Sequence, residues 1–203
     1  LSNNNMGDTA AEALASLKHT PLLHTLSLDL SNNNMGDTAA EALASLKEAP
    51  LLHTLSLGLS NNDDMGHAGA QALASLKEAP LLHTLSLGLS NNDDMGHAGA
   101  QALASLKEAP LLHTLSLGLS YNRMGDAGAQ ALASLKQAPL LDILGLDLSN
   151  NSIGDAGAKA LIMLHEAPFL HTLSLDLFDN QLRRLANLDG WPRLWCAGVI
   201  QGS

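Results

Sequence analysis

Leucines alternate with small polar residues in a short segment that recurs along the chain. In residues 54–59 a leucine occupies every second position, with threonine, serine and glycine between them. A period of two predicts a β-strand with one buried face. Further along the unit, Ala39, Leu43 and Leu46 stand at helical spacing. Each unit is therefore predicted to contain a strand, a turn, a helix and a return.

The whole unit recurs six times with a period of 29 or 30 residues, and the copies begin at Leu1, Leu30, Leu59, Leu89, Leu119 and Leu148. A repeat of this length predicts a solenoid, because each unit buries its apolar face against its neighbours rather than in a central core. The stacked strands are expected to form a parallel sheet, with leucines inward and small polar residues on the open face.

An asparagine follows the predicted strand at the same place in each unit. A side-chain amide has donors and an acceptor, so it can pair with backbone groups of a turn that is buried between units. We therefore expect a structural asparagine ladder that starts at Asn4 and continues through Asn33, Asn62, Asn92, Asn122, Asn151 and Asn180.

The predicted helix has its own start and stop signals. Asp37 or Thr38 is expected to cap the helix of the second unit, and Thr38 with Glu41 has the spacing of a capping box. Lys47 falls in the last turn, where a cation suits the helix dipole, and Pro50 ends the helix.

Written out, residues 146–161 read LDLSNNSIGDAGAKAL. This pattern resembles the leucine-rich repeat of the ribonuclease-inhibitor-like class, and it recurs as six repeats over residues 1–176. The resemblance implies an α/β solenoid of horseshoe form, with a parallel β-sheet on the concave face and helices on the convex face. Because the alanine-rich helical half is slim, we expect a shallower arc than usual. Members of that class mostly bind other proteins.

The spacing of the leucines changes from Leu177 onward, which predicts a shorter, divergent leucine-rich repeat in residues 177–203. Aromatic and basic side chains gather there, and tryptophan and arginine are frequent at interaction hot spots. We expect partner-binding residues in this segment, namely Phe178, Arg183, Arg184, Trp191, Arg193 and Trp195. The alternative is that both tryptophans cover the open end of the core while the arginines are solvated.

The predicted concave face is chemically plain, and its centre consists of Thr54, Ser56, Thr84, Ser86, Thr114 and Ser116. Interaction hot spots favour Trp, Tyr and Arg, which are absent from these positions. This surface is therefore interpreted either as structural filler or as a weak, ladder-like binding face.

A column of histidines stands at the entrance to the predicted strands: His24, His53, His83, His113 and His171, with Asp142 in the remaining place. Strand spacing would bring neighbouring rings to about 5 Å from each other. That distance suggests metal bridging or a response to pH. The simpler interpretation is that copying of the repeat placed them there, with each ring hydrogen-bonded to its neighbour or to water. We expect no metal and no cofactor.

The composition of the chain argues against several classes of partner and structure. The chain has 20 acidic and 10 basic residues, and its lysines occur singly rather than in a basic stripe, so we expect no nucleic-acid partner. No apolar run approaches the roughly 20 residues of a membrane-spanning helix. Cys196 is the only cysteine, which excludes an internal disulfide. The compartment stays open, with a lean toward an intracellular setting because cysteine-rich end caps are absent.

Residues 59–88 and 89–118 are identical, so neither copy holds a unique catalytic group. The first unit begins without a polar cap, so we expect the chain to be part of a longer protein. We predict a non-catalytic scaffold that mediates protein–protein interaction. An alternative is an accessory structural subunit at the periphery of a larger assembly. Some relatives in this repeat class stimulate GTP hydrolysis, but Arg123 is the one residue that could suggest it here, and a surface substitution explains it more simply.

Overall fold

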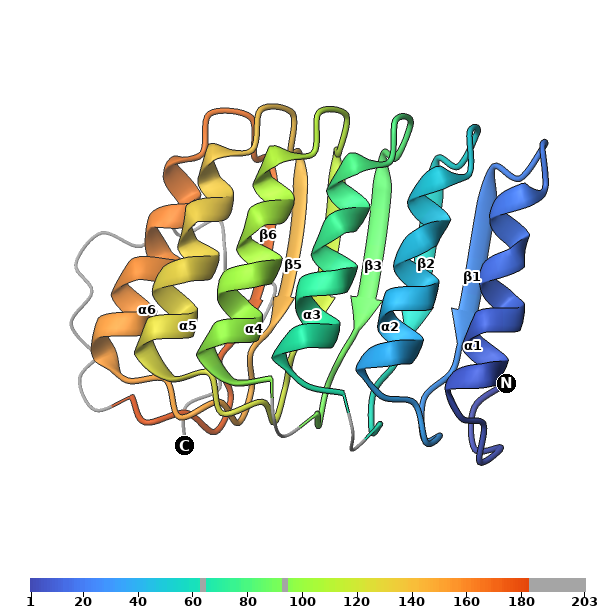
Figure 1. The fold of residues 1–203 in the computed structure, drawn as a ribbon. Coiled ribbons are helices and arrows are strands. Elements are labelled where there is room, and N and C mark those ends of the chain that lie inside the picture. Colours follow the sequence, from blue (N-terminus) through green and yellow to red (C-terminus); the bar gives the residue numbers. More distant parts are fainter. Residues whose placement is uncertain (63–64, 93–94, 183–203) are drawn as a thin grey trace.

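The computed structural model describes residues 1–62, 65–92 and 95–182. Within them, helices and strands alternate along the chain (Figure 1). The helices are α1 (Asp8–Ala15), α2 (Asp37–Ala44), α3 (His67–Ala74), α4 (Gly96–Leu103), α5 (Gly125–Leu132) and α6 (Asp155–Ile162). The strands are β1 (Thr25–Asp29), β2 (Thr54–Gly58), β3 (Thr84–Gly88), β4 (Thr114–Gly118), β5 (Ile143–Asp147) and β6 (Thr172–Asp176).

Each helix passes directly into a short 3₁₀ turn before the chain returns to the sheet. These turns are η1 (Ser16–His19), η2 (Ser45–Glu48), η3 (Ser75–Glu78), η4 (Ala104–Glu108), η5 (Ala133–Gln137) and η6 (Met163–Glu166). A 3₁₀ turn tightens the end of a helix and satisfies part of its unpaired carbonyl groups. The extended residue that follows each turn leads the chain back toward the next strand.

The six strands pair in chain order as one parallel sheet. Equivalent residues of consecutive units lie opposite one another, as Leu55 does with Leu85 and Leu85 with Leu115. Figure 1 shows the helices together on one side of this sheet, which stays open and does not curl round. The predicted α/β solenoid is confirmed, whereas the expected shallow arc stays a prediction.

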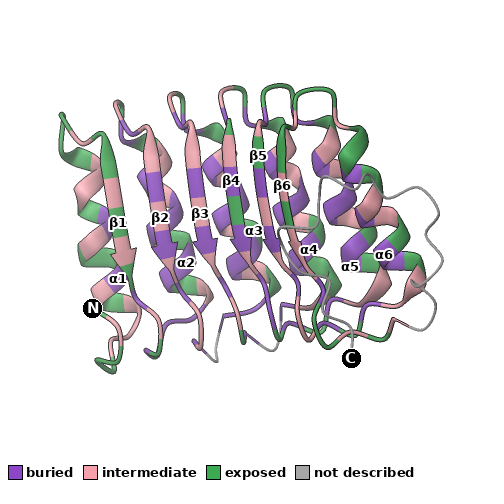
Figure 2. Ribbon diagram, turned by 180° about the vertical axis from the view of Figure 1, so that it is seen from behind, coloured by how far each residue is buried: buried purple, intermediate pink, exposed green. Residues whose placement is uncertain are grey.

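The core is a continuous slab between the sheet and the helices. Leu55, Leu57 and Leu59 point inward and are at most 1% exposed, where they meet Leu43 and Leu46 from the helical side. Figure 2 shows that burial is deepest in the middle strands, whereas β1 and β6 are more exposed. This gradient follows from stacking, because an end unit has a neighbour on one side alone.

The predicted asparagine ladder is present, and Asn92 illustrates its bonding. Its Nδ2 donates to the carbonyl oxygens of Leu59 at 3.2 Å and Leu89 at 3.0 Å, and its Oδ1 accepts the backbone N–H of Asn62 at 3.0 Å. Each amide therefore joins its own turn to the turn of the preceding unit. The same arrangement recurs at Asn33, Asn62, Asn122, Asn151 and Asn180. Among the described residues, no buried side-chain nitrogen or oxygen lacks a hydrogen-bond partner.

The helix starts differ from the prediction. Gly36 precedes α2 without any side-chain capping bond, so neither Asp37 nor the expected capping box of Thr38 and Glu41 caps this helix. Instead, Oδ1 of Asp37 accepts the N–H groups of Gly66 at 2.8 Å and Gly69 at 2.7 Å, at the start of α3. The prediction was wrong because it looked for the cap inside one unit, whereas the carboxylate caps the helix of the next one.

Aspartates at this position in two other units make bonds of the same kind. Asp8 accepts the N–H of Gly36 at 2.8 Å. Asp126 accepts the N–H groups of Gly154 at 2.7 Å and Gly157 at 2.8 Å. A carboxylate at a helix N-terminus pairs otherwise unsatisfied N–H groups and favours the positive end of the helix dipole. These aspartates therefore link consecutive helices much as the asparagines link consecutive turns.

Two units of identical sequence show how far this carboxylate determines the local backbone. Gly66 and Gly96 occupy the same place in residues 59–88 and 89–118. Gly66 is extended with φ −108°, whereas Gly96 is left-handed with φ +52°. Gly66 follows a unit that carries Asp37, and Gly96 follows a unit that carries His67. Without the carboxylate, the N–H of Gly96 turns to the carbonyl oxygen of Asn122 at 3.1 Å.

The fifth and sixth units repeat the contrast. Gly125 follows His97, has φ +59° and donates to the carbonyl oxygen of Asn151 at 2.8 Å. Gly154 follows Asp126 and is again extended, with φ −94°. In the second to sixth units this glycine is thus extended after aspartate and left-handed after histidine, whereas Gly7 of the first unit is extended, with φ −98°, without a carboxylate.

Replacing Asn122 by alanine is expected to destabilise the fold strongly. The change leaves the buried N–H of Asn92 without its acceptor, and it removes one of the two amide donors from each of the carbonyl oxygens of Leu89 and Leu119, which keep those of Asn92 and Asn151. One unpaired buried group costs about 1–3 kcal/mol, so we expect the free energy of unfolding in urea to fall by at least about that amount. The control is Asn91→Gly, at an exposed left-handed position, which should stay near wild type. Equal losses of unfolding free energy in both variants would contradict a stabilising role for the asparagine ladder.

The substitution His97→Asp is expected to stabilise the protein by supplying the missing cap. By analogy with Asp126, the new carboxylate would accept the N–H groups of Gly125 and Gly128. Capping bonds contribute about 1 kcal/mol, so the free energy of unfolding should rise by about that amount at neutral pH. The gain should disappear as the carboxyl is protonated in acid. His97→Ala serves as the control, and an equal gain in that variant would show that loss of the imidazole is the cause.

Candidate interaction surface

The outward face of β2, β3 and β4 is a regular array of small polar side chains. The sheet brings together the residues that the sequence proposed for this face, Thr54, Ser56, Thr84, Ser86, Thr114 and Ser116. Equivalent residues lie in register, and the side chains are partly or fully exposed. Neighbouring rows are about 4.8 Å apart, as strand spacing dictates. Their role in binding stays a prediction.

The fifth unit interrupts this array. Ile143, Gly145 and Asp147 of β5 stand where β4 has threonine, serine and glycine. Ile143 points to the outward face and is 40% exposed. Asp147 lies in register with Asp176 of β6. The open face thus acquires an apolar group at one end of these strands and two carboxylates at the other.

Both carboxylates are held by the turns that follow their strands. Oδ1 of Asp147 accepts the N–H and the hydroxyl of Ser149, at 3.1 and 2.7 Å. Oδ1 of Asp176 accepts the N–H of Phe178 at 2.8 Å. The same turn occurs at β1, where the backbone N–H of Ser31 lowers the pKa of Asp29. Among the described residues, Oδ2 of Asp147 and Asp176 has no hydrogen-bond partner, so each carboxylate has one oxygen free.

An open hollow of about 420 Å³ lies at the other end of β5 and β6. It is lined by Leu140, which is 37% exposed, by Phe169, which is 52% exposed, and by three polar residues. Among these, Nδ1 of His171 lies 2.6 Å from Oδ1 of Asp142. Phe169 replaces the leucine found at this place in the earlier units. The hollow is therefore walled partly by exposed apolar groups.

The histidine column is a stack of parallel rings. The ring centroids of His24, His53, His83 and His113 follow one another at 5.4–5.5 Å. Each Nδ1 lies 2.7–2.8 Å from the carbonyl oxygen two residues earlier. The expected close spacing is confirmed, but the bonding partner is a backbone carbonyl rather than the next ring.

This stack does not fit a shared metal ion. The rings are stacked with interplanar angles of 11–17°, so their nitrogens do not converge on one point as two ligands of a single zinc ion must. In the part of the chain that the structure describes, no group of three or more His, Cys, Asp or Glu side chains is placed to hold a metal. The column is better explained by stacking and backbone hydrogen bonds.

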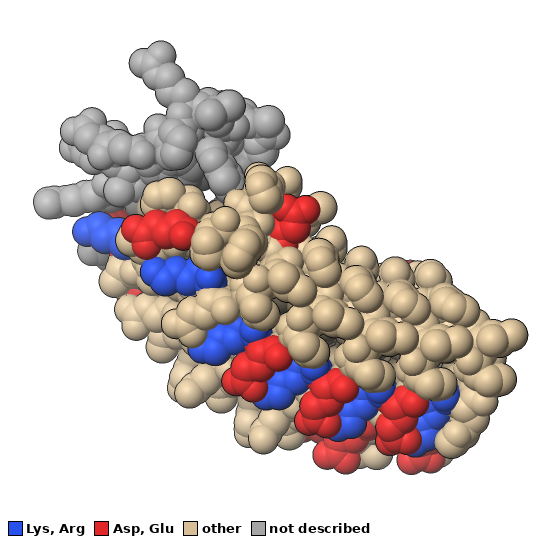
Figure 3. Space-filling model, turned by 90° about the horizontal axis from the view of Figure 1, so that it is seen from above, with Lys and Arg blue, Asp and Glu red and all other residues tan. Residues whose placement is uncertain are grey.

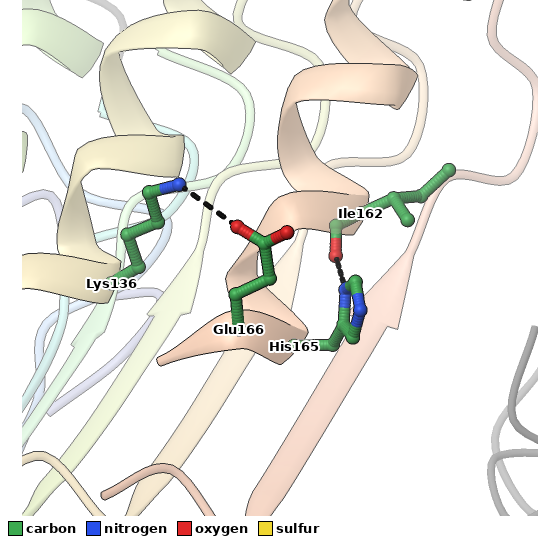
Figure 4. Close-up of polar contacts among 4 residues, drawn as sticks. All are labelled: Lys136, Ile162, His165 and Glu166. Carbon is green, nitrogen blue, oxygen red and sulfur yellow. Dashed lines mark hydrogen bonds and ion pairs between the residues drawn. The ribbon is translucent and has the colours of Figure 1, made fainter. Parts of the chain in front are cut away.

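Lysine and glutamate alternate along the end of the helical layer that is seen in Figure 3. Lys47 reaches Glu78 of the next unit at 2.7 Å, and this hydrogen bond and charge lower the pKa of the Glu78 carboxyl. Figure 4 shows the same contact between Lys136 and Glu166 at 3.3 Å. Lys107 instead donates to Gln137 at 2.9 Å. Exposed pairs of this kind contribute little stability, but the glutamates neutralise the positive charge of the row of lysines.

The residues proposed in the C-terminal segment are only partly described. Phe178 is 46% exposed beside Asp176. Arg183, Arg184, Trp191, Arg193 and Trp195 lie outside the described residues. Asn180 continues the ladder and Gln181 pairs with Gly154, so a further unit begins after β6. The shorter repeat expected in residues 177–203 stays a prediction.

Comparison with known families supports the assignment of the repeats. A family model described as Leucine Rich repeat matches residues 1–15, 23–44, 112–133 and 145–161, which fall in the units of the parallel sheet described above. The chain is a leucine-rich repeat protein. A search of curated proteins finds no match to this leucine-rich repeat chain. Its membership of the ribonuclease-inhibitor-like class stays a prediction. In residues 1–62, 65–92 and 95–182, no helix is long and apolar enough to cross a membrane.

Sequence reasoning interpreted the concave face of this leucine-rich repeat protein as chemically plain, and it did not single out exposed Ile143 or the hollow lined by Leu140 and Phe169. Leu140 and Phe169 line one hollow because they precede β5 and β6, which are adjacent in the sheet. For Ile143 and Phe169, the signal that could have found them is the departure of the fifth and sixth units from the copies before them.

Zinc is expected to leave the thermal stability of the protein unchanged. Because the stacked, nearly parallel rings do not converge on one ion, Zn²⁺ at tenfold molar excess should not alter the Tm measured by circular dichroism. A rise in Tm that is abolished by His83→Ala, and not by the exposed change His67→Ala, would contradict this prediction.

Proposed function

We propose that this leucine-rich repeat protein is a non-catalytic scaffold that binds other proteins through the open face of its sheet. Leucine-rich repeat domains typically mediate protein–protein interaction. The observation that carries the proposal is the alternation of inward and outward side chains along each strand. The inward leucines form the core, while the outward threonines and serines stay at least partly exposed and in register over neighbouring units.

Such a face is suited to binding because it is fixed before a partner arrives. Backbone pairing and the asparagine ladder hold each strand, so few side chains have to be ordered on association. The outward threonine and serine side chains are short and lose little conformational freedom. The net charge of −10 favours a partner with a basic surface.

A second candidate is an accessory subunit at the edge of a larger assembly. Within the described residues, β1 pairs with β2 alone, and the core leucines Leu26 and Leu28 are only partly buried beside its open edge. An unpaired strand edge with apolar groups beside it is a common site of association. This end of the array would then be the contact.

Site-specific photo-crosslinking distinguishes the two candidates. A photoreactive residue would be placed at Ser86 on the open face, at Gln101 on the helical side, or at Glu12 on the exposed end of α1. In extract from the native source, the scaffold proposal predicts defined protein adducts at Ser86 and none at Gln101. Ser56→Arg should remove these adducts, whereas Gln71→Arg, an equally charged change on the helical side, should not.

Adducts confined to Glu12 would favour the accessory subunit instead. Equal labelling at Ser86 and Gln101, or adducts at Ser86 that survive Ser56→Arg, would contradict the scaffold proposal.

A further inference from the structure

We infer that an extended segment of a partner protein docks on the C-terminal end of the open face, and that it carries one hydrophobic side chain and one lysine or arginine. This inference rests on the proposed function and specifies the partner. The docking surface, here called the β5–β6 patch, consists of Leu140, Ile143, Gly145, Asp147, Phe169 and Asp176.

The first step is that the fold does not require most of these residues. At β2, β3 and β4 the same register is adopted with threonine in place of Ile143 and glycine in place of Asp147, and a leucine stands before each of these strands in place of Phe169. A Cβ on Gly145 would make only ordinary contacts, the nearest being Ser116 Oγ at 3.5 Å, so serine would fit there as it does in the neighbouring strands. Leu140 is the usual leucine of the repeat, and β1 carries Asp29 at the position of Asp147. The residues that packing within the array does not explain are therefore Ile143, Gly145 and Phe169.

The second step concerns the apolar half of the patch. Ile143, Leu140 and Phe169 are large hydrophobic side chains with a substantial exposed fraction. Exposing an isoleucine where a threonine suffices loses the favourable burial of apolar surface. Gly145 leaves space on the outward face next to Ile143. A hydrophobic side chain of a partner could lie there and cover the exposed apolar groups.

The third step concerns the charged half. The carboxylates of Asp147 and Asp176 lie on adjacent strands, oriented by their turns and with one oxygen each unpaired among the described residues. The outward positions of β4, β5 and β6 carry no lysine or arginine. A paired, preoriented set of carboxylates matches a guanidinium or ammonium group. A second copy of this chain is a poor occupant, since its net charge is also −10.

The geometry sets the spacing of the two partner groups. Ile143 and Asp147 are four residues apart on one strand, which corresponds to about 13 Å. An extended segment has the same rise, and its residues at even separations share one face. The partner's hydrophobic residue and its lysine or arginine should therefore stand four positions apart, in either direction along the segment.

The test is a selection of random 12-residue peptides, displayed on phage, against the immobilised full chain. Enriched peptides are expected to carry a hydrophobic residue and a lysine or arginine four positions apart. Synthetic versions would be measured by fluorescence anisotropy. Ile143→Thr with Phe169→Leu, and separately Asp147→Gly with Asp176→Gly, should each weaken binding at least tenfold. Both variants restore residues that the preceding units already carry, and a thermal melt verifies their folding.

The matched controls are Gln71→Ala and Gln101→Ala, at exposed positions on the helical side, which should change the affinity less than twofold. Added salt should weaken binding to wild type, and it should have much less effect on the Asp147→Gly, Asp176→Gly variant. This difference would assign the salt dependence to the two carboxylates.

Several outcomes would overturn the inference. Enriched peptides that lack the pair, or that bind the restored variants as well as wild type, would remove the patch as the docking place. Failure to enrich any peptide would exclude an extended partner. Binding that appears only after deletion of residues 183–203 would show that this chain's own C-terminal segment occupies the patch. In each case, adducts at Ser86 in the crosslinking experiment would still support the scaffold proposal.

Discussion

The fold depends on hydrogen bonds that cross from one unit to the next. Leucine burial already disfavours a shift of one residue between strands, because the shift would turn the leucines to the open face. The ladder asparagines reinforce this register, because each amide pairs with its own turn and with the turn before it. A shift of one residue would leave several buried backbone groups unpaired at every junction, at a cost of about 1–3 kcal/mol each. The side chains of the open face are regularly spaced because these bonds hold neighbouring units in alignment.

Much of this architecture was predictable, because it is encoded by short-range patterns that recur. Leucines with a period of two predicted the strands, and the repeat length predicted the stack. The position of Asn92 directly after a strand predicted its buried, bonded amide. In each case the sequence of one unit, repeated, contains the information. The family assignment then agreed with the pattern that had suggested it.

The helix starts were not predictable in the same way, because they depend on a contact between units. Asp37 follows its own helix-start glycine in sequence, yet its carboxylate bonds to Gly66 and Gly69 about 30 residues later. Local capping rules assume that a cap and its helix are neighbours in sequence. The β5–β6 patch was not predicted, for a related reason. Its residues, such as Ile143 and Phe169, belong to two units that become neighbours only when adjacent strands are paired. A comparison of equivalent positions between the units would have predicted these residues better.

The contrast between Gly66 and Gly96 has a consequence for how such arrays change in length. Because the helix start in the second to sixth units varies with the side chain that the preceding unit supplies, a newly inserted copy is expected to take the start that its predecessor favours. The copy also imposes a start on its successor. Gain or loss of a unit by gene duplication or deletion would therefore alter a helix at the junction while every unit kept its sequence. In this protein, the conformation at a helix start therefore depends on the neighbouring unit and not only on the sequence of the unit itself.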